Sequence, residues 1–254
     1  MEKGVEGPSQ RFSRFIRHNF LYVTAEGMAT NFAFGMTNPF LAVYALALGG
    51  SSLLVGLVTA LPALVNVFAF ILAAKIVERK ATKLPTVMTW TFIYRLFYIP
   101  LALVPFIPEF RPHVMVAVIS LMAAPSAIAN TAWTAMMGDI FPENKRGNIF
   151  GLRNMYVGLT GTIGSLGAGY LLDRVGFPLN WTALFAIAFG VAMIGLVLMG
   201  RIREPSYEED LSYHSFSYRV KGDRRSYRLW QRQQRMKMPH VDEGFSAGLP
   251  LMDR

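Results

Sequence analysis

The sequence predicts an all-α, polytopic membrane protein with six transmembrane helices, and three observations carry this prediction. First, 53% of the 254 residues are apolar and 16% are charged, whereas soluble domains are roughly 45–50% apolar and about 25% charged. Second, the apolar residues gather in six runs of 19 to 27 residues, and a helix needs roughly 20 residues to cross a bilayer. Third, the charged residues inside these runs are only Glu26, Lys75 and Arg95.

Each expected span ends where polar or turn-forming residues interrupt its apolar run. Glycines and serines at 49–52 end the first span, and a basic stretch ends the second. The third and fourth are separated by 106–113, and the fifth and sixth by 173–180. Because these connections are short, neighbouring spans are expected to pack as antiparallel hairpins. In chain order the spans are expected at 20–46, 53–77, 84–105, 114–137, 154–172 and 181–200.

The spans divide the chain into three parts. Residues 1–19 are interpreted as a basic cytoplasmic arm, with arginines and aromatic rings suited to the headgroup region. Residues 20–200 form the six-helix transmembrane bundle. Residues 201–254 carry eleven basic and eight acidic residues and no apolar run long enough to span, which favours a mostly disordered cytoplasmic tail or a linker between two bundles.

The placement of the basic residues predicts the orientation. Of the 25 Lys and Arg, 22 fall in the arm, in or beside the second and fourth connections, or in the tail. Because basic residues accumulate on the cytoplasmic side, both termini are expected there, in a plasma membrane or a bacterial inner membrane. The tail also interleaves basic and aromatic residues, as RNA-binding segments do. Since the net charge of +9 is explained by orientation, we expect lipid and no nucleic acid as its partner.

The reactive residue types argue against an enzyme. The chain contains no cysteine, which excludes disulfides and thiolate chemistry, and all four histidines lie outside the expected spans. An intramembrane Ser-His protease or a histidine-ligated metal site is therefore not expected, and no metal or other cofactor is implied.

Arg95 is the residue that most needs an explanation. It lies eleven residues into the third expected span, and an Arg at the centre of a membrane helix costs about 2.5–3.5 kcal/mol on insertion scales. Glu26, in the first span, is the one carboxylate among the spans. Their depths differ by roughly 7 Å at 1.5 Å per residue, so we expect the two to pair across the bundle interior. The pair is either a functional site for a proton or charged substrate, or a fixed structural ion pair.

Other polar residues follow helical spacing. Glu26 and Thr30 lie on one stripe of the first span, and Asn31 and Asn38 lie on another. A helix facing lipid would not be polar on two sides, so protein or water is expected around it. Spans three and four add further polar and aromatic residues, which serve either as interhelical contacts or as cavity lining. The expected substrate or proton pathway consists of Glu26, Asn31, Asn38, Arg95, Asn130 and Trp133.

Two cytoplasmic loops carry a family resemblance. The first, residues 74–83, reads AKIVERKATK and resembles a degenerate form of the major facilitator superfamily signature G-x-x-x-D-R-x-G-R-R. The second, residues 138–154, reads GDIFPENKRGNIFGLRN and is similar to the family's loop between helices four and five. Residues 170–177, after a glycine-rich fifth span, are similar as well. The chain lacks the Arg that many members carry in helix four, and Arg95 is an alternative interior cation.

This resemblance covers about residues 15–203 and implies the N-terminal six-helix half of a secondary transporter. Such a protein moves a small solute by alternating access without ATP hydrolysis, with or without a coupled proton. Family members usually have twelve spans in two halves, so either a second chain or second copy completes the cavity, or the reading frame is truncated. The resemblance further implies a cytoplasmic gate of charged residues. Its expected members are Glu78, Arg79, Asp139 and Arg146.

Two other functions remain open from the residues alone. A permease subunit driven by a separate ATPase fits six spans, although the chain contains no phosphate-binding G-x-x-x-x-G-K-[ST] loop of its own. A membrane scaffold that acts through its basic tail and transports nothing is the second. Ordinary topogenic charge would explain the bases of the expected gate, although it would not explain the paired acids.

Overall fold

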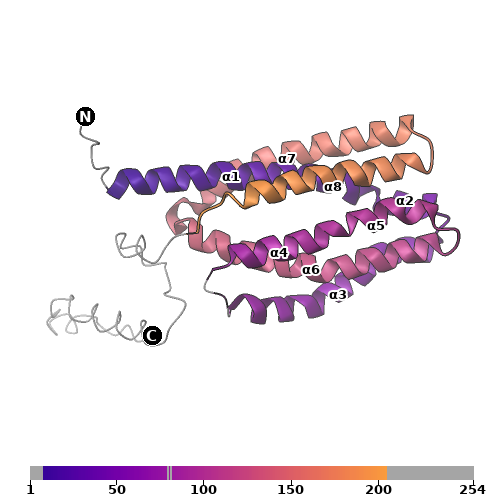
Figure 1. The fold of residues 1–254 in the computed structure, drawn as a ribbon, viewed down its shortest axis with the longest axis horizontal. Helices are drawn as coiled ribbons and strands as arrows, with labels where there is room; N and C mark the ends of the chain where they lie inside the picture. The colour runs from indigo at the N-terminus through magenta and orange to yellow at the C-terminus, as the bar shows by residue number, and fades with distance from the viewer. Residues whose placement is uncertain (1–7, 79, 81, 205–254) are drawn as a thin grey trace, which may run out of the picture. The chain divides into compact units, whose positions relative to one another are not determined.

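The structure is a computed structural model that describes residues 8–78, 80 and 82–204. All regular elements in this part of the chain are helices (Figure 1), which confirms the predicted fold class. The first helix, α1 (Pro8–Thr37), includes residues 8–19 of the expected basic arm. Residues 1–7 and 205–254, with almost all of the expected tail, lie outside the described residues.

The first expected span is a broken helix. It consists of α1, the 3-10 turn η1 (Asn38–Phe40) and α2 (Leu41–Ala47). Pro39 lies inside η1, where its missing backbone N–H and its clash with the preceding turn favour a break in the α-helix. The break redirects the chain, since α1 packs against α7 and α8 whereas α2 contacts α3 and α6.

The third expected span is broken as well, at a place that the sequence analysis did not single out. It consists of α4 (Leu84–Leu96), α5 (Tyr98–Leu103) and the 3-10 turn η2 (Val104–Phe106). Pro100 lies four residues after Leu96, so it cannot donate the hydrogen bond that the Leu96 carbonyl would accept in a continuous helix. This loss favours the break, and α4 ends at Leu96 while α5 begins at Tyr98.

The other four spans are continuous helices. They are α3 (Ser52–Glu78), α6 (Arg111–Ile140), α7 (Glu143–Arg174) and α8 (Leu179–Met199). Four of the six spans have the length and apolarity of a membrane crossing on their own: α3, the α4–η2 segment, α6 and α8. The other two, which begin with α1 and α7, are the more polar spans, and α1 and α7 pack against each other. The polar residues Glu26 and Thr37 of α1 are buried in this arrangement, and so are Gly161 and Gly164 of α7.

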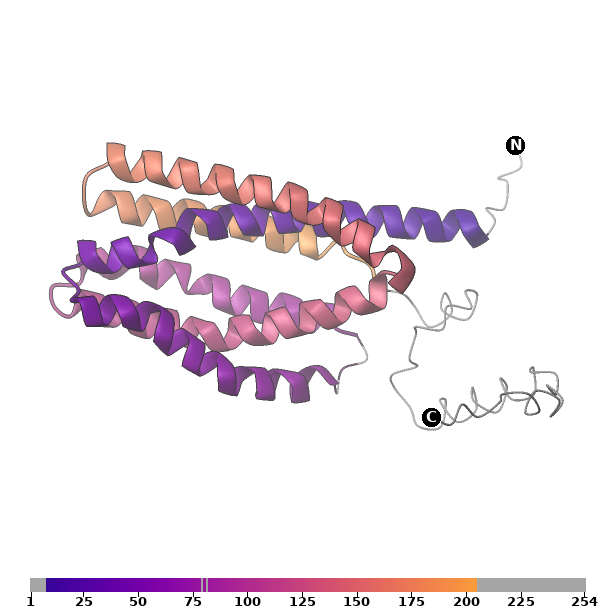
Figure 2. The same cartoon turned by 180° about the vertical axis from the view of Figure 1, so that it is seen from behind.

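The helices form two layers of three. One layer contains α1, α7 and α8, and the other contains α3, α6 and the α4–α5 segment, as Figure 1 and the reverse view in Figure 2 show. The layers meet mainly where α8 packs against α4 and α5. At one end α1, α4 and α7 begin while α3, α6 and α8 end, and we call it the basic end because it holds Lys83, Arg146, Arg201 and Arg203.

Aromatic contacts join the layers at the end opposite the basic end. The ring of Tyr44 stacks on Trp181, with centroids 4.4 Å apart, and the Tyr44 hydroxyl donates to the Leu101 carbonyl over 2.7 Å. Thr182 donates to the Ala102 carbonyl over 2.9 Å. All of these groups belong to the larger of two buried apolar clusters or adjoin it, so this end of the bundle is closed by dense packing.

Glycines allow α1 and α7 to approach backbone to backbone. A Cβ at Gly164 would collide with the carbonyl of Phe32, and one at Gly35 would collide with Gly161. In contrast, a Cβ at Gly167 would meet nothing within 4 Å. The small-residue pattern of the fifth span is therefore an interface on one face of α7, where small residues permit close van der Waals packing.

This interface yields a matched pair of variants. We expect Gly164→Ala to lower the free energy of unfolding by about 1–3 kcal/mol, because the added methyl group forces two backbones apart. Gly167→Ala should leave stability unchanged or slightly raised, because its methyl group has open space. Thermal unfolding of both variants in detergent micelles measures the difference. Equal stability of the two would show that α1 and α7 do not pack as described.

Candidate functional site

Arg95 lies at the junction of the two layers. Its side chain extends from α4, is 1% exposed, and contacts both α1 and α8. Nη1 donates to the Ala192 carbonyl, Nη2 donates to Thr30 Oγ1 over 2.7 Å, and Nη2 lies 3.4 Å from Glu26 Oε1. The structure thus brings together the two charges that the sequence analysis expected to pair. A buried guanidinium is costly unless it is paired and hydrogen-bonded, and three acceptors supply that compensation here.

Thr30 links the two charges. Its hydroxyl accepts from Arg95 and donates to Glu26 Oε1 over 2.7 Å, one helical turn away on α1. Glu26 is itself 3% exposed, so water does not stabilise its carboxylate. The stabilising donors are the neutral Thr30 hydroxyl and the charged Arg95 guanidinium. Glu26 and Thr30, which share one face of the first span, therefore supply the hydrogen-bond acceptors that α1 offers to Arg95.

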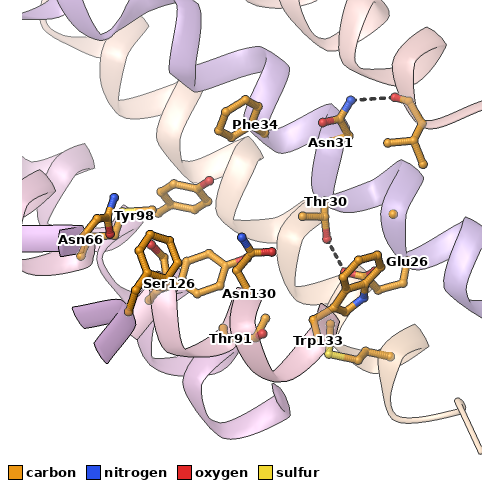
Figure 3. Close-up of a pocket in the computed structure, with 18 of the residues that line it drawn as sticks. Glu26, Thr30, Asn31, Phe34, Asn66, Thr91, Tyr98, Ser126, Asn130 and Trp133 are labelled. Atoms are coloured by element: carbon orange, nitrogen blue, oxygen red, sulfur yellow. Dashed lines mark hydrogen bonds between the residues drawn. The ribbon is translucent and has the colours of Figure 1, made fainter. Parts of the chain in front are cut away.

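A cavity of about 500 Å³ adjoins this pair and lies between the layers. Residues from α1, α3, α4, α6 and α7 contribute to its wall, and Figure 3 shows many of them pointing into it. Small-molecule sites are typically 300–1,000 Å³, mostly apolar, with a few convergent polar groups. The described lining has this character, with aromatic and aliphatic walls and polar groups at Glu26, Thr30, Asn66, Thr91 and Asn130.

Most of the residues expected along the pathway lie at this cavity. Glu26, Asn31, Asn130 and Trp133 contribute to the wall. Asn31 also donates to the Val157 carbonyl of α7 over 2.7 Å, so part of its hydrogen-bonding capacity is used within the bundle. Arg95 lies behind the wall, where Thr30 and Glu26 separate it from the cavity. Asn38 is exposed in η1 and is not part of the lining.

Arg153 is the main cavity residue that the sequence analysis missed. The sequence analysis assigned it to a cytoplasmic connection, but the helix that carries it, α7, begins at Glu143. Ten residues of helix place Arg153 about 15 Å along the axis from that start, and its side chain contributes to the cavity wall. The helix-starting Pro142 is the signal that could have located it, because proline favours the first positions of a helix.

The Arg153 guanidinium is held by its neighbours. Its carbon lies 4.8 Å from the centroid of the Trp133 ring, a cation–π contact between α7 and α6. It passes over Gly27 of α1, where a Cβ would collide with the guanidinium. Nε donates to the Val23 carbonyl over 3.4 Å, which is a long contact for an N–H···O bond.

The expected gate residues that the structure describes, Glu78, Asp139 and Arg146, lie at the basic end. Asp139 pairs with Lys83, whose side chain is 2% exposed at the start of α4. Arg146 donates to the carbonyls of Gly138 and Phe141, the latter over 2.7 Å, and so binds the C-terminal end of α6. Glu78 is exposed at the end of α3, and Arg79 lies outside the described residues.

The residues after α8 bind back onto the basic end. Glu204 Oε1 accepts from the backbone N–H groups of Lys83 and Leu84, over 2.7 and 3.1 Å, and thereby caps the start of α4. Asn19 of α1 donates to the Arg203 carbonyl and accepts from the Arg203 N–H, each over 2.9 Å. The segment that follows α8 thus joins Asn19 of α1 to the start of α4.

Metal ligands are not gathered anywhere in the described ranges. Across residues 8–78, 80 and 82–204, no three His, Asp or Glu side chains lie close enough to hold a metal ion.

These features define a class of protein, namely polytopic helical membrane proteins with a charged cavity inside the bundle. The sequence model of the major facilitator superfamily matches residues 27–232, which is more than half of the chain. The chain therefore belongs to the major facilitator superfamily, as the loop motifs indicated, and is an integral membrane transporter of the major facilitator type. A comparison with curated proteins gave no match.

The buried pair can be tested by a double-mutant cycle. We expect Glu26→Gln and Arg95→Gln each to lower the free energy of unfolding by about 3–5 kcal/mol. Each substitution removes one charge of the pair and leaves the other charge buried without it. The double variant should lose less than the two single losses together, since no lone charge remains. Chemical unfolding in micelles measures all four proteins. Additive losses would show that the two side chains do not interact.

The basic end can be tested at Asp139. We expect Asp139→Asn to lower the unfolding temperature, because it removes a carboxylate that pairs with the buried Lys83 ammonium. Asp139→Glu should retain part of the stability. Asp173→Asn, at an exposed site on the opposite end of the bundle, is the matched control and should unfold like the unmodified protein. If the unfolding curves of Asp139→Asn, Asp139→Glu and Asp173→Asn were superimposed, the Lys83–Asp139 pair would not contribute to stability.

Proposed function

We propose that the protein moves a small solute across the membrane by alternating access, as a secondary active transporter. The observation that carries this proposal is the Arg95–Thr30–Glu26 group, a charged cluster beside a cavity of about 500 Å³, with Glu26 and Thr30 in the cavity wall and Arg95 behind them. A purely structural core gains little from a buried ion pair, because apolar residues of similar volume are often as stable. A charged cluster beside a cavity can instead change its ion pairing when a proton or a substrate binds in the cavity.

The same cluster supports proton coupling. Glu26 contributes to the cavity wall and is held by Arg95 and Thr30. Protonation of its carboxyl group would remove the charge that attracts Arg95, and the layer junction at Ala192 would then lose one of its electrostatic supports. A proton or substrate at Glu26 could in this way bias the packing of one layer against the other, which is the kind of two-state element that transport requires.

The Lys83–Asp139 pair and the Arg146 contacts are proposed as parts of the cytoplasmic gate, with the basic end facing the cytoplasm. These contacts join α4 to α6 and close the turn between α6 and α7. Charge-assisted contacts of this kind can hold one arrangement and release it in another. Glu78 and Arg79 are retained as proposed members of the gate on the basis of the loop motif alone.

The cavity has an exposed side. Phe34 is 52% exposed and Phe70 is 47% exposed although both contribute to its wall, and Asn130 is also exposed. The exposed apolar side chains can face lipid, but the exposed Asn130 amide would be costly there, which favours a protein partner on this side. We propose that a second six-helix bundle, from another chain or from a second copy of this one, covers this side. A permease subunit needing a separate ATPase and a non-transporting scaffold remain the rival functions.

Transport can be tested in proteoliposomes. The panel contains radiolabelled benzoate, glucose, an amino acid and a lipophilic cation, supplied under an imposed proton gradient without ATP. We expect gradient-driven uptake of at least one, and a loss of roughly 30-fold or more in Arg95→Ala, because removing one member of a buried, hydrogen-bonded charge pair costs about 2–5 kcal/mol. Arg17→Ala, at an exposed position of α1, is the control. Uptake that requires added ATPase and ATP would favour the permease subunit, and none under either condition would favour the scaffold.

A further inference from the structure

The charged residues at the cavity do not balance. Among the described lining residues the charged side chains are Glu26 and Arg153, and Arg95 lies directly behind the wall. Two guanidinium groups face one carboxylate, so the formal charge of this group is positive by one. A cavity with low-dielectric walls strengthens the effect of such an excess on a bound ligand.

Arg95 cannot be the group that meets a ligand in this arrangement. Its side chain is 1% exposed, and both of its terminal nitrogens donate to acceptors on α1 and α8. Its charge is also compensated by Glu26 at 3.4 Å. Glu26 also attracts the Arg153 guanidinium from beyond 4.0 Å, so one carboxylate is shared by two guanidinium groups. Of these two groups, Arg153 is the one that contributes to the cavity wall.

Arg153 has hydrogen-bonding capacity to spare. Its contacts to the Val23 carbonyl and to Asn154 Oδ1 are 3.4 and 3.3 Å long, beyond the usual 2.7–3.2 Å of such bonds. Within the described ranges no carboxylate lies within 4.0 Å of it. An arginine offers five N–H donors in a planar fork that matches a carboxylate or phosphate group.

The position of this guanidinium is fixed before a ligand arrives. Trp133 supports one face at 4.8 Å from its ring centroid, and Gly27 provides the space in which the group lies. A side chain held in this way loses little conformational freedom on binding, which favours affinity. The glycine at position 27 is therefore part of the site, because any side chain there would occupy the space of the guanidinium.

The rest of the cavity suits an apolar body. Phe34, Phe70, Tyr98 and Met122 contribute to its walls. Figure 3 shows Asn66 on the other side of the cavity from Trp133. Asn66 Oδ1 is buried and has no hydrogen-bond partner among the described residues, so its amide can bind a polar group at the far end of a ligand.

From these observations we infer that the cavity selects an organic anion, whose acidic head binds Arg153 while its apolar body contacts the aromatic wall. The inference deepens the proposed function by naming the substrate class of the same cavity. It differs from a general basic surface, because the excess charge is one guanidinium at a defined place with aromatic side chains around it. Free phosphate has the anionic head but lacks the apolar body. Comparing phosphate with an aromatic anion therefore tests the role of Arg153 and the role of the aromatic wall separately.

A matched series of probes tests the inference on the full chain in micelles of a neutral detergent. Benzoate, benzyl alcohol and benzylammonium share one ring and differ in charge, and inorganic phosphate has the charge without the ring. Binding is measured by equilibrium dialysis of labelled probe and by the shift in unfolding temperature. We expect benzoate to bind at least about tenfold more tightly than each of the other three, because a hydrogen bond to a charged group is worth more than a neutral one.

Variants then assign the binding to Arg153. We expect Arg153→Gln to weaken benzoate binding about tenfold or more, and Arg153→Lys to weaken it less, since the charge remains but the planar fork is lost. Arg174→Gln is the matched control. Arg174 lies on the same helix and also stacks on an aromatic ring, Tyr170, at 5.3 Å, but it is exposed and outside the cavity. Circular dichroism checks that each variant retains its helices, and Arg153→Lys decides the test if Arg153→Gln does not fold.

Three results would overturn the inference: no benzoate binding, equal or tighter binding of a neutral or cationic probe, or equal benzoate affinity in Arg153→Gln and the unmodified protein. Phosphate binding as tight as benzoate binding would overturn the role of the aromatic wall. The proposed function is separable from these results. Benzoate binding without gradient-driven uptake would support the inference and contradict the proposed transport function. Uptake of glucose without benzoate binding would support the transport function and contradict the inference.

Discussion

One buried guanidinium links the two helix layers and dictates which residues must surround it. Arg95 reaches from α4 to the backbone of α8 and to two side chains of α1, so a single residue connects three helices. Water cannot compensate a charge in that place, and every acceptor must come from the protein. This requirement explains why the first span carries Glu26 and Thr30 where a lipid-facing helix would carry apolar residues. The cost of burying the group is offset only when both layers are correctly packed.

The helix α1 has two faces with different functions, which resolves the polarity of its sequence. Toward α7 it presents backbone and glycine, with Asn31 donating to the Val157 carbonyl. Toward α4 and the cavity it presents Glu26 and Thr30. The two polar stripes that excluded a lipid-facing position thus correspond to two different protein neighbours. Close backbone packing on one side holds the charged residues in position on the other.

The sequence predicted the features that follow from crossing a bilayer. It did not predict those that depend on how closely helices distant in the chain pack against each other. The spans followed from apolar length, and the pairing of Glu26 with Arg95 followed from comparing their depths. The place of Arg153 did not follow, because it depends on where α7 begins and on a glycine of another helix at position 27. The partner of Asp139 did not follow either. Several basic residues were available nearby, and only packing places Lys83 against it.

The links at the basic end constrain how the protein can change shape. Asn19 is bonded to Arg203, and Glu204 caps the start of α4, so α1, at a position eleven residues after its start, and the first turn of α4 are linked through one short segment. The two helices cannot separate there without breaking the two hydrogen bonds on one side of this link or the two on the other. Widening on this side must then come from α3, α6 or α7, which this link does not include. The hinge of the bundle is accordingly expected beside Asn19, and the moving parts on the opposite flank.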